Sequence, residues 1–236
     1  RNDSEPCPTL AAPVQADSVT SGEDMVLQAA ETSVQGSWVT KGKKTYYRTL
    51  AGSYLTGLQT ISGKKYFFDS DGVLQKKKWV KVNGKTYYIG GSGYALKSQW
   101  LYKGKLLVYV KSDCTVAQDE MVKIWGSTYY FNSKFKRSKG FKKYKNQYYY
   151  CNSKGIVQKK KWITKGKKKY YVLKSGVRVD NKLVKIGKYK YYFNAKGVLQ
   201  TNTEIEYKDK IYKADKKGIC VYVEDVKHEE EESTED

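Results

Sequence analysis

The side chains through which this 236-residue chain could bind a ligand are mainly aromatic, with 23 Tyr and 5 Trp against 6 Phe and 2 Met. Aromatic faces stack on flat or apolar groups and attract cations. The only histidine is His228, and just ten acidic residues are spread over residues 36–223. No Ser-His-Asp arrangement, His-based metal site or pair of facing glycosidase carboxylates is therefore expected. We predict a binding protein that needs no metal or cofactor, and not an enzyme.

The aromatic residues recur at a fixed spacing. Copies of one short pattern begin at anchor positions 20 or 21 residues apart, namely Trp38, Leu58, Trp79, Trp100, Met121, Phe141, Trp162, Leu183 and Glu204. An aromatic pair follows eight and nine residues after most anchors, and a glycine follows fourteen residues after most of them. Cys114 and Phe135 replace that glycine in two copies. Repetition at this period predicts a repeat architecture.

Each copy has the pattern of a β-hairpin. A short run such as Trp79–Val82 is followed by Asn83-Gly84 and a second run from Lys85 to Ile89. Asn-Gly tolerates the positive φ angles of a two-residue hairpin turn. Because one hairpin cannot bury its apolar face alone, the copies must stack on one another.

The copies fall into three classes that rotate in order. The copies anchored at Trp38, Trp100 and Trp162 share Lys three residues and Gly four residues after the anchor. The copies anchored at residues 58, 121 and 183 share Ile three residues and Phe ten residues after the anchor. Equivalent copies therefore recur about every 62 residues. We predict an all-β fold, a β-hairpin solenoid of nine repeats of ~21 residues with three hairpins per turn, over residues 36–223.

The two ends differ in composition from this array. Residues 1–35 hold all three prolines and six acids against Arg1 alone, and residues 224–236 hold eight acids against one Lys. We predict a disordered N-terminal linker over 1–35 and an acidic disordered tail over 224–236. The sequence has no run of about 18 apolar residues, so no transmembrane segment is predicted. A start at Arg1 indicates either a removed signal peptide or a fragment.

Without its ends the array is strongly basic, with 43 basic and 10 acidic residues. Such a surface attracts polyanions, and the attraction weakens with salt. A nucleic-acid or general polyanion binder is therefore an alternative function. The array holds Arg only at Arg48, Arg137 and Arg178, which argues against specific nucleic-acid readout because such proteins generally use Arg for bidentate contacts.

The four cysteines lack metal-ligand spacing. Cys151 and Cys220 stand where other copies have small apolar residues, so we expect buried thiols. Trp125 falls in a hairpin turn, where it could be merely exposed or contact a ligand.

Two stretches, "WVKVNGKTYYIGGSGYA" from Trp79 and "ISGKKYFFDSDGVLQ" from Ile61, resemble a known family. It is the cell-wall-binding repeat family of choline-binding modules, glucan-binding domains of streptococcal glucosyltransferases and repetitive carbohydrate-binding domains of large clostridial toxins. The resemblance covers residues 36 to about 223. It implies a β-hairpin solenoid, secretion from a Gram-positive bacterium and non-covalent attachment to a wall polysaccharide, teichoic acid or host glycan.

In this family choline lies in a cage made by the anchor Trp, an aromatic residue just before the Tyr pair and a Tyr of the neighbouring copy. Here only Tyr148 is aromatic at that place, and several copies have Lys there, which repels a cation. Choline is therefore not expected at most copies, and any remaining choline site should lie around Phe141, Tyr148 and Tyr149. Stacking of sugar rings on the Trp and Tyr side chains is the alternative mode of binding.

These observations favour a secreted, non-catalytic, wall-associated module that binds cell-wall polymer or glycan through aromatic platforms and a Lys-rich surface. A chain of this kind could also be the anchoring fragment of a larger wall-acting enzyme. The same rings could serve as core alone, since Trp and Tyr bury much area. The candidate ligand contacts are Trp38, Tyr47, Trp79, Tyr88, Trp100, Tyr109, Phe141, Tyr148, Tyr149, Trp162 and Tyr171.

Overall fold

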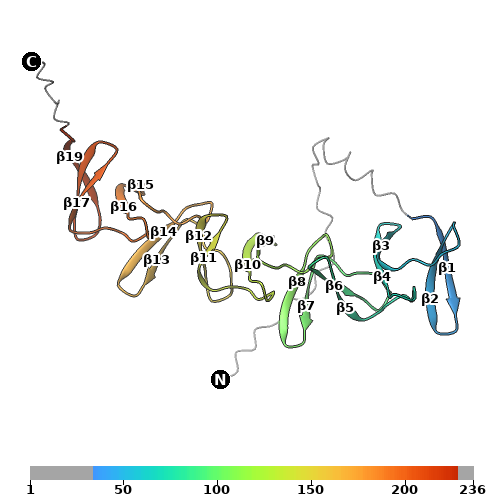
Figure 1. Cartoon of the computed structure of the whole chain (residues 1–236). Coiled ribbons are helices and arrows are strands. Elements are labelled where there is room, and N and C mark those ends of the chain that lie inside the picture. Colours follow the sequence, from blue (N-terminus) through green and yellow to red (C-terminus); the bar gives the residue numbers. More distant parts are fainter. Residues whose placement is uncertain (1–33, 228–236) are drawn as a thin grey trace, which may run out of the picture. The chain divides into compact units, whose positions relative to one another are not determined.

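The computed structural model describes residues 34–227, which form β-strands and turns without a helix in that range (Figure 1). The predicted all-β fold of repeated hairpins is confirmed. Residues 1–33 of the predicted linker over 1–35, which include Cys7, and residues 228–236 of the predicted tail over 224–236 lie outside the described residues. The chain divides into two units, Arg1–Leu96 and Lys97–Asp236, which are described separately. The winding at three hairpins per turn and the number of repeats stay predictions.

The first unit contains hairpins of two antiparallel strands each. Their strands are β1 (Gly36–Lys41) with β2 (Lys44–Thr49), β3 (Gly57–Ile61) with β4 (Lys64–Phe68), and β5 (Lys78–Val82) with β6 (Lys85–Ile89).

The second unit continues the same pattern. Its hairpins are β7 (Gln99–Lys103) with β8 (Leu106–Val110), β9 (Glu120–Ile124) with β10 (Ser127–Phe131), β11 (Gly140–Tyr144) with β12 (Gln147–Cys151), β13 (Lys161–Lys165) with β14 (Lys168–Val172), β15 (Lys182–Ile186) with β16 (Tyr189–Phe193), and β17 (Thr203–Tyr207) with β18 (Lys210–Ala214). A final strand, β19 (Cys220–Asp225), lies between β16 and β18 in a five-stranded sheet. It extends beyond residue 223, where we expected the array to end.

The hairpin register follows from the turn. Asn83 and Gly84 adopt φ of 49° and 76°, as a two-residue hairpin turn with positive φ at both positions requires. This turn sets Trp79 opposite Tyr88. Anchor and second pair residue therefore share one face of each hairpin, and the rings of the candidate site come together in this way.

The bends between hairpins are held by a polar side chain that binds the backbone. Asp69 Oδ1 accepts from the N–H groups of Asp71 at 3.0 Å and Val73 at 2.8 Å, which is an Asx-type turn. Asn132, Asn152, Asn194 and Asp215 make the same pair of bonds in their bends. Asp69 therefore acts as a turn residue.

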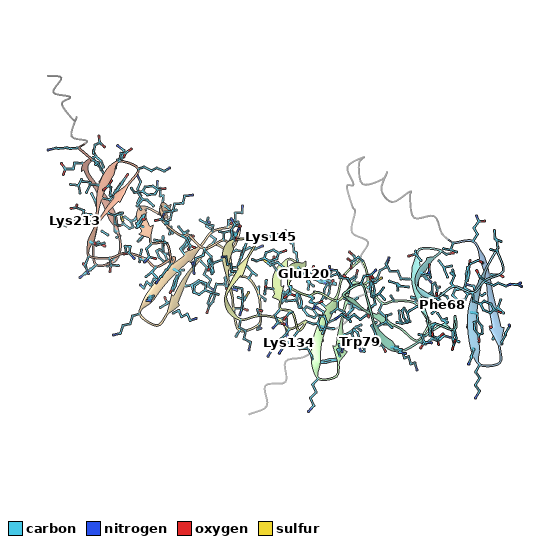
Figure 2. The ribbon with its side chains drawn as sticks, viewed as in Figure 1. Phe68, Trp79, Glu120, Lys134, Lys145 and Lys213 are labelled. Carbon is cyan, nitrogen blue, oxygen red and sulfur yellow. The ribbon has the colours of Figure 1, made fainter. Side chains whose placement is uncertain are left out.

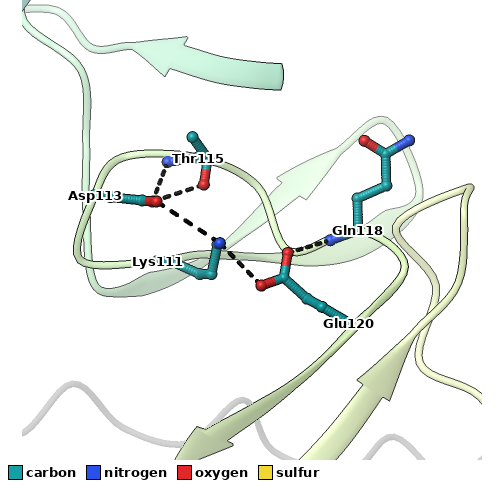
Figure 3. A network of polar contacts seen from close by, with 5 residues as sticks. All are labelled: Lys111, Asp113, Thr115, Gln118 and Glu120. Atoms are coloured by element: carbon teal, nitrogen blue, oxygen red, sulfur yellow. Dashed lines mark hydrogen bonds and ion pairs between the residues drawn. The ribbon is translucent and has the colours of Figure 1, made fainter. Parts of the chain in front are cut away.

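The bend after β8 uses charge in addition (Figure 3). Asp113 accepts from the Thr115 N–H at 2.9 Å and hydroxyl at 2.6 Å, and Lys111 bridges Asp113 at 3.7 Å and Glu120 at 2.9 Å. Burial alone would raise the pKa of Asp113, but its bonds to Thr115 and the charge of Lys111 lower it overall. Cys114 takes the glycine position of this bend at φ 73°, where an L-residue is strained.

Neighbouring hairpins are joined by one recurring backbone bond. The residue sixteen positions after an anchor donates its N–H to a carbonyl in the strand of the preceding hairpin. The bonds are Leu74 to Thr45 at 2.7 Å, Ala95 to Lys65 at 2.7 Å, Val157 to Thr128 at 2.7 Å, Arg178 to Tyr148 at 2.8 Å and Leu199 to Lys169 at 2.8 Å. This bond fixes the side chain at position sixteen against the hairpin before it.

The core is a series of small clusters. Phe68 (labelled in Figure 2), Phe131 and Phe193, which share the place ten residues after an anchor, are each 0% exposed. Cys151 and Cys220 are buried, free thiols, and burial raises the pKa of Cys151 to about 11.

Candidate aromatic binding site

Rings from two successive hairpins meet at Trp38. Trp38 in β1 lies 5.0 Å between centroids from Tyr47 in β2 and 4.8 Å from Tyr66 in β4, both edge-on. Phe68 lies 6.0 Å away and closes the base. These four residues are the Trp38 cluster. Trp38 itself is 43% exposed, so the cluster presents an indole to solvent.

The same arrangement recurs at Trp100. Its ring lies 5.1 Å from Tyr109 in the same hairpin, 5.5 Å from Tyr129 in the next one, and 6.0 Å from Phe131. These four residues are the Trp100 cluster, and Trp100 is half-buried.

A third copy is built at Trp162. The ring lies 5.2 Å from Tyr171, 5.0 Å from Tyr191 and 5.8 Å from Phe193, and these four residues are the Trp162 cluster. The rotation of the three classes of copy explains why the four-ring cluster recurs. All four rings are present only where a copy with a Trp anchor is followed by a copy that has Tyr eight residues and Phe ten residues after its anchor. Each edge-to-face pair contributes about 0.5–1.5 kcal/mol beyond area burial. The clusters therefore hold hairpins together as well as offering a platform.

Three tyrosines of these clusters are held in the neutral form near pH 7. Burial raises the pKa of Tyr66, Tyr109 and Tyr191 above the ordinary phenol value. A neutral phenol keeps the negative ring face that attracts cations and the flat surface on which a sugar stacks.

Comparisons with known families match this geometry. A model described as a choline-binding repeat matches residues 55–106, and one described as a cell wall binding repeat matches residues 139–156 and 181–199. The predicted family resemblance is confirmed. Repeats of this type indicate an association of the chain with the cell wall. No curated protein sequence matches the chain.

Solved structures support the fold of these cell-wall-binding repeats. CbpJ from Streptococcus pneumoniae TIGR4 is 18% identical at a TM-score of 0.54, with 79% of this chain and 70% of that chain covered. The choline-binding domain of CbpL from Streptococcus pneumoniae is 22% identical at 0.54, with 82% and 99% covered. The modular autolysin LytC from the same species is 21% identical at 0.50, with 81% and 48% covered. This chain thus spans about half the length of LytC.

The cell-wall-binding repeat at Phe141 forms a different cluster. Phe141 lies 5.0 Å from Tyr150 and 4.7 Å from Tyr170. The guanidinium carbon of Arg178 lies 5.2 Å from the Phe141 ring centroid and 4.2 Å from that of Tyr148. We expected any remaining choline site here, and the structure places an arginine over these rings.

The predicted contacts divide by burial and position. Tyr47 and Tyr171 are only 6% and 8% exposed, so most of their surface packs inside their clusters, and their role as ligand contacts stays a prediction. Trp79 and Tyr88 form a ring pair at 4.8 Å. The Tyr149 hydroxyl donates to Gln147 Oε1 at 3.2 Å, and it is Tyr150, one residue later, that packs on Phe141.

Sequence reasoning missed Tyr66, Tyr129 and Tyr191 as partners of the anchors. Their signal was present, because each stands eight residues after the anchor of a copy that also has Phe at ten. It also missed Arg137 and Arg178, which share the place sixteen residues after an anchor.

Trp125 lies at the tip of the β9–β10 hairpin with φ 53° and is 82% exposed. Among residues 34–227, no group of three or more His, Cys, Asp or Glu side chains could hold a metal ion. No helix in the described part of the chain is long and apolar enough to cross a membrane.

Proposed function

We propose that this chain is a secreted, non-catalytic module that holds a cell-wall polymer, with aromatic clusters as contact points and lysines as a surrounding positive field. The observation that carries the proposal is the recurrence of one four-ring arrangement at Trp38, Trp100 and Trp162, with Trp38 43% exposed. Contacts that recur along a chain suit a ligand that itself repeats. Weak contacts on one polymer combine into avidity.

The lysines suit an anionic polymer such as teichoic acid. The runs Lys76–Lys78, Lys159–Lys161 and Lys167–Lys169 are exposed throughout. Lys145 and Lys213, labelled in Figure 2, are exposed as well. Exposed charges of one sign raise the local concentration of an oppositely charged polymer, and salt screens the effect.

The test is retention on purified wall with and without its teichoic acid, across a salt series. We expect retention to fall when teichoic acid is removed and to persist in part at high salt, because stacking is not screened. Complete release by about 0.3 M salt, where the Debye length is below 8 Å, would mean that charge acts alone and would favour the general polyanion binder.

A second candidate is the anchoring part of a larger wall-acting enzyme. It is supported by the match to LytC, an autolysin of which this chain covers 48%. A hydrolase assay on wall with the product of the full reading frame separates the two, since a non-catalytic protein releases no soluble fragments.

A further inference from the structure

The residue sixteen positions after an anchor decides what lies over the rings of the preceding hairpin. The N–H of Arg178 donates to the carbonyl of Tyr148 at 2.8 Å, and the N–H of Leu199 donates to that of Lys169 at the same distance. The backbone placement is thus shared. What differs is the side chain.

Arg178 covers the rings beside Phe141 closely. Its guanidinium carbon lies 4.2 Å from the ring centroid of Tyr148, 5.2 Å from that of Phe141 and 5.9 Å from that of Tyr170, and its side chain is 8% exposed. Asp180 holds it from the other side, accepting from Nε at 2.6 Å and from Nη2 at 2.9 Å. Stacking with a bidentate carboxylate pair fixes the plane of a guanidinium.

Arg137 stands at the same repeat position over the Trp100 cluster. Its guanidinium carbon lies 5.4 Å from the Trp100 ring centroid, within the range of cation–π attraction. Nη1 donates to the carbonyl of Lys154 at 3.3 Å.

The other two Trp clusters have leucine at this position. Leu74 packs against Tyr47, Ile61 and Phe68 at the Trp38 cluster, and Leu199 belongs to the core of the Trp162 cluster. A leucine completes the apolar wall and brings no charge to the ring faces.

We propose that Arg137 and Arg178 are built-in occupants that close their aromatic clusters to a ligand cation, so that these residues determine which clusters of the chain admit a quaternary ammonium group. A second cation at an arginine-covered face would lose the ring contact and meet like charge. The Trp38 and Trp162 clusters, lined by leucine, stay open to such a group. The inference rests on the proposed binding role of the clusters and adds the residue that sets their selectivity.

The experiment counts sites for choline chloride on the full chain by isothermal titration calorimetry, with changes in Trp fluorescence as a second readout. Arg137→Leu copies Leu74 and Leu199 into the Trp100 cluster, and we expect one additional site. Arg48→Leu is the matched control, since it removes the same charge at an exposed arginine, and it should leave the number of sites unchanged.

Two further variants keep the test decisive. Arg178→Leu leaves Asp180 without its partner, so it is combined with Asp180→Thr. Threonine is chosen because Thr201 stands at the equivalent position of the next copy. This double variant should also gain one choline site. Leu199→Arg should remove a site from the Trp162 cluster. Circular dichroism of each variant establishes that the fold is kept.

The inference is overturned if the folded Arg137→Leu protein binds no more choline than the parent chain, if Arg48→Leu gains as much, or if no variant binds choline. These outcomes differ from failure of the proposed function. Loss of wall retention by the parent chain would refute the function, yet a choline site gained on replacing Arg137 would still establish that arginine closes the cluster.

Discussion

Replacing Trp38 by alanine should weaken polymer binding more than replacing Trp100 does, although both substitutions remove the same ring from the same arrangement. Each indole contacts a Tyr of its own hairpin and a Tyr and a Phe of the next, at centroid distances that agree within 1 Å. The difference is the cover, because Arg137 lies over Trp100 while Trp38 is 43% exposed.

The cost in stability can be worked out from burial. A fully buried Trp removes up to about 250 Å² from water, and Trp38 buries just over half of its surface, or about 140 Å². At about 25 cal/mol per Å² this is roughly 3.5 kcal/mol, an upper value because the unfolded chain is itself partly compact. We expect a loss of about 2–3 kcal/mol for Trp38→Ala. For a chain of this size each kcal/mol lowers Tm by about 2–4 °C.

The cost in binding is separate. By analogy with base stacking, losing an open aromatic platform costs about 1–3 kcal/mol, so retention on long wall polymer should fall at least fivefold for Trp38→Ala and less than twofold for Trp100→Ala. The assay is a pull-down at a temperature where both variants are folded by circular dichroism. Equal losses for the two variants, or unchanged retention for Trp38→Ala, would refute the reasoning that exposure of the indole makes the platform.

Three further outcomes follow from particular contacts. Burial raises the pKa of Cys151 to about 11, so the stabilisation that this thiol gives is fully present below the pKa of an unfolded thiol, near 8.5, and is lost as pH rises towards 11. Cys151→Ala should therefore remove about 2 kcal/mol of the pH dependence of the free energy of urea unfolding between pH 8 and 11. An unchanged pH profile would contradict this. Lys169 belongs to the same hairpin as Trp162. Lys169→Thr should tighten choline binding at the Trp162 cluster about twofold by calorimetry, since two like charges about 8 Å apart in water repel by about 0.5 kcal/mol. Weaker binding by this variant would mean that Lys169 does not repel choline. Asp69→Ala removes two bonds to backbone N–H groups and should cost about 1–3 kcal/mol in chemical unfolding, with Asp71→Ala as the neutral control.

The fold was predictable because its causes are local. Asn83-Gly84 selects the hairpin turn, and the turn sets Trp79 opposite Tyr88, so each hairpin follows from its own twenty residues. The lateral neighbour of an anchor was harder to identify. It depends on the backbone bond between one hairpin and the next, such as Leu74 to Thr45, and hydrophobic period alone does not give the register of that bond.

The occupancy of the clusters lay beyond sequence reasoning for a related reason. The family pattern places a ring just before the Tyr pair, and Tyr148 is the only aromatic residue at that place in this sequence. In the structure the ring of Tyr148 lies 4.2 Å from the guanidinium carbon of Arg178, a residue thirty positions further along the chain. A position whose backbone is fixed by a bond to the preceding hairpin can change from Leu to Arg without altering the fold. In such a repeat, selection can therefore act on ligand choice through this one side chain while the rings and the hairpins stay the same.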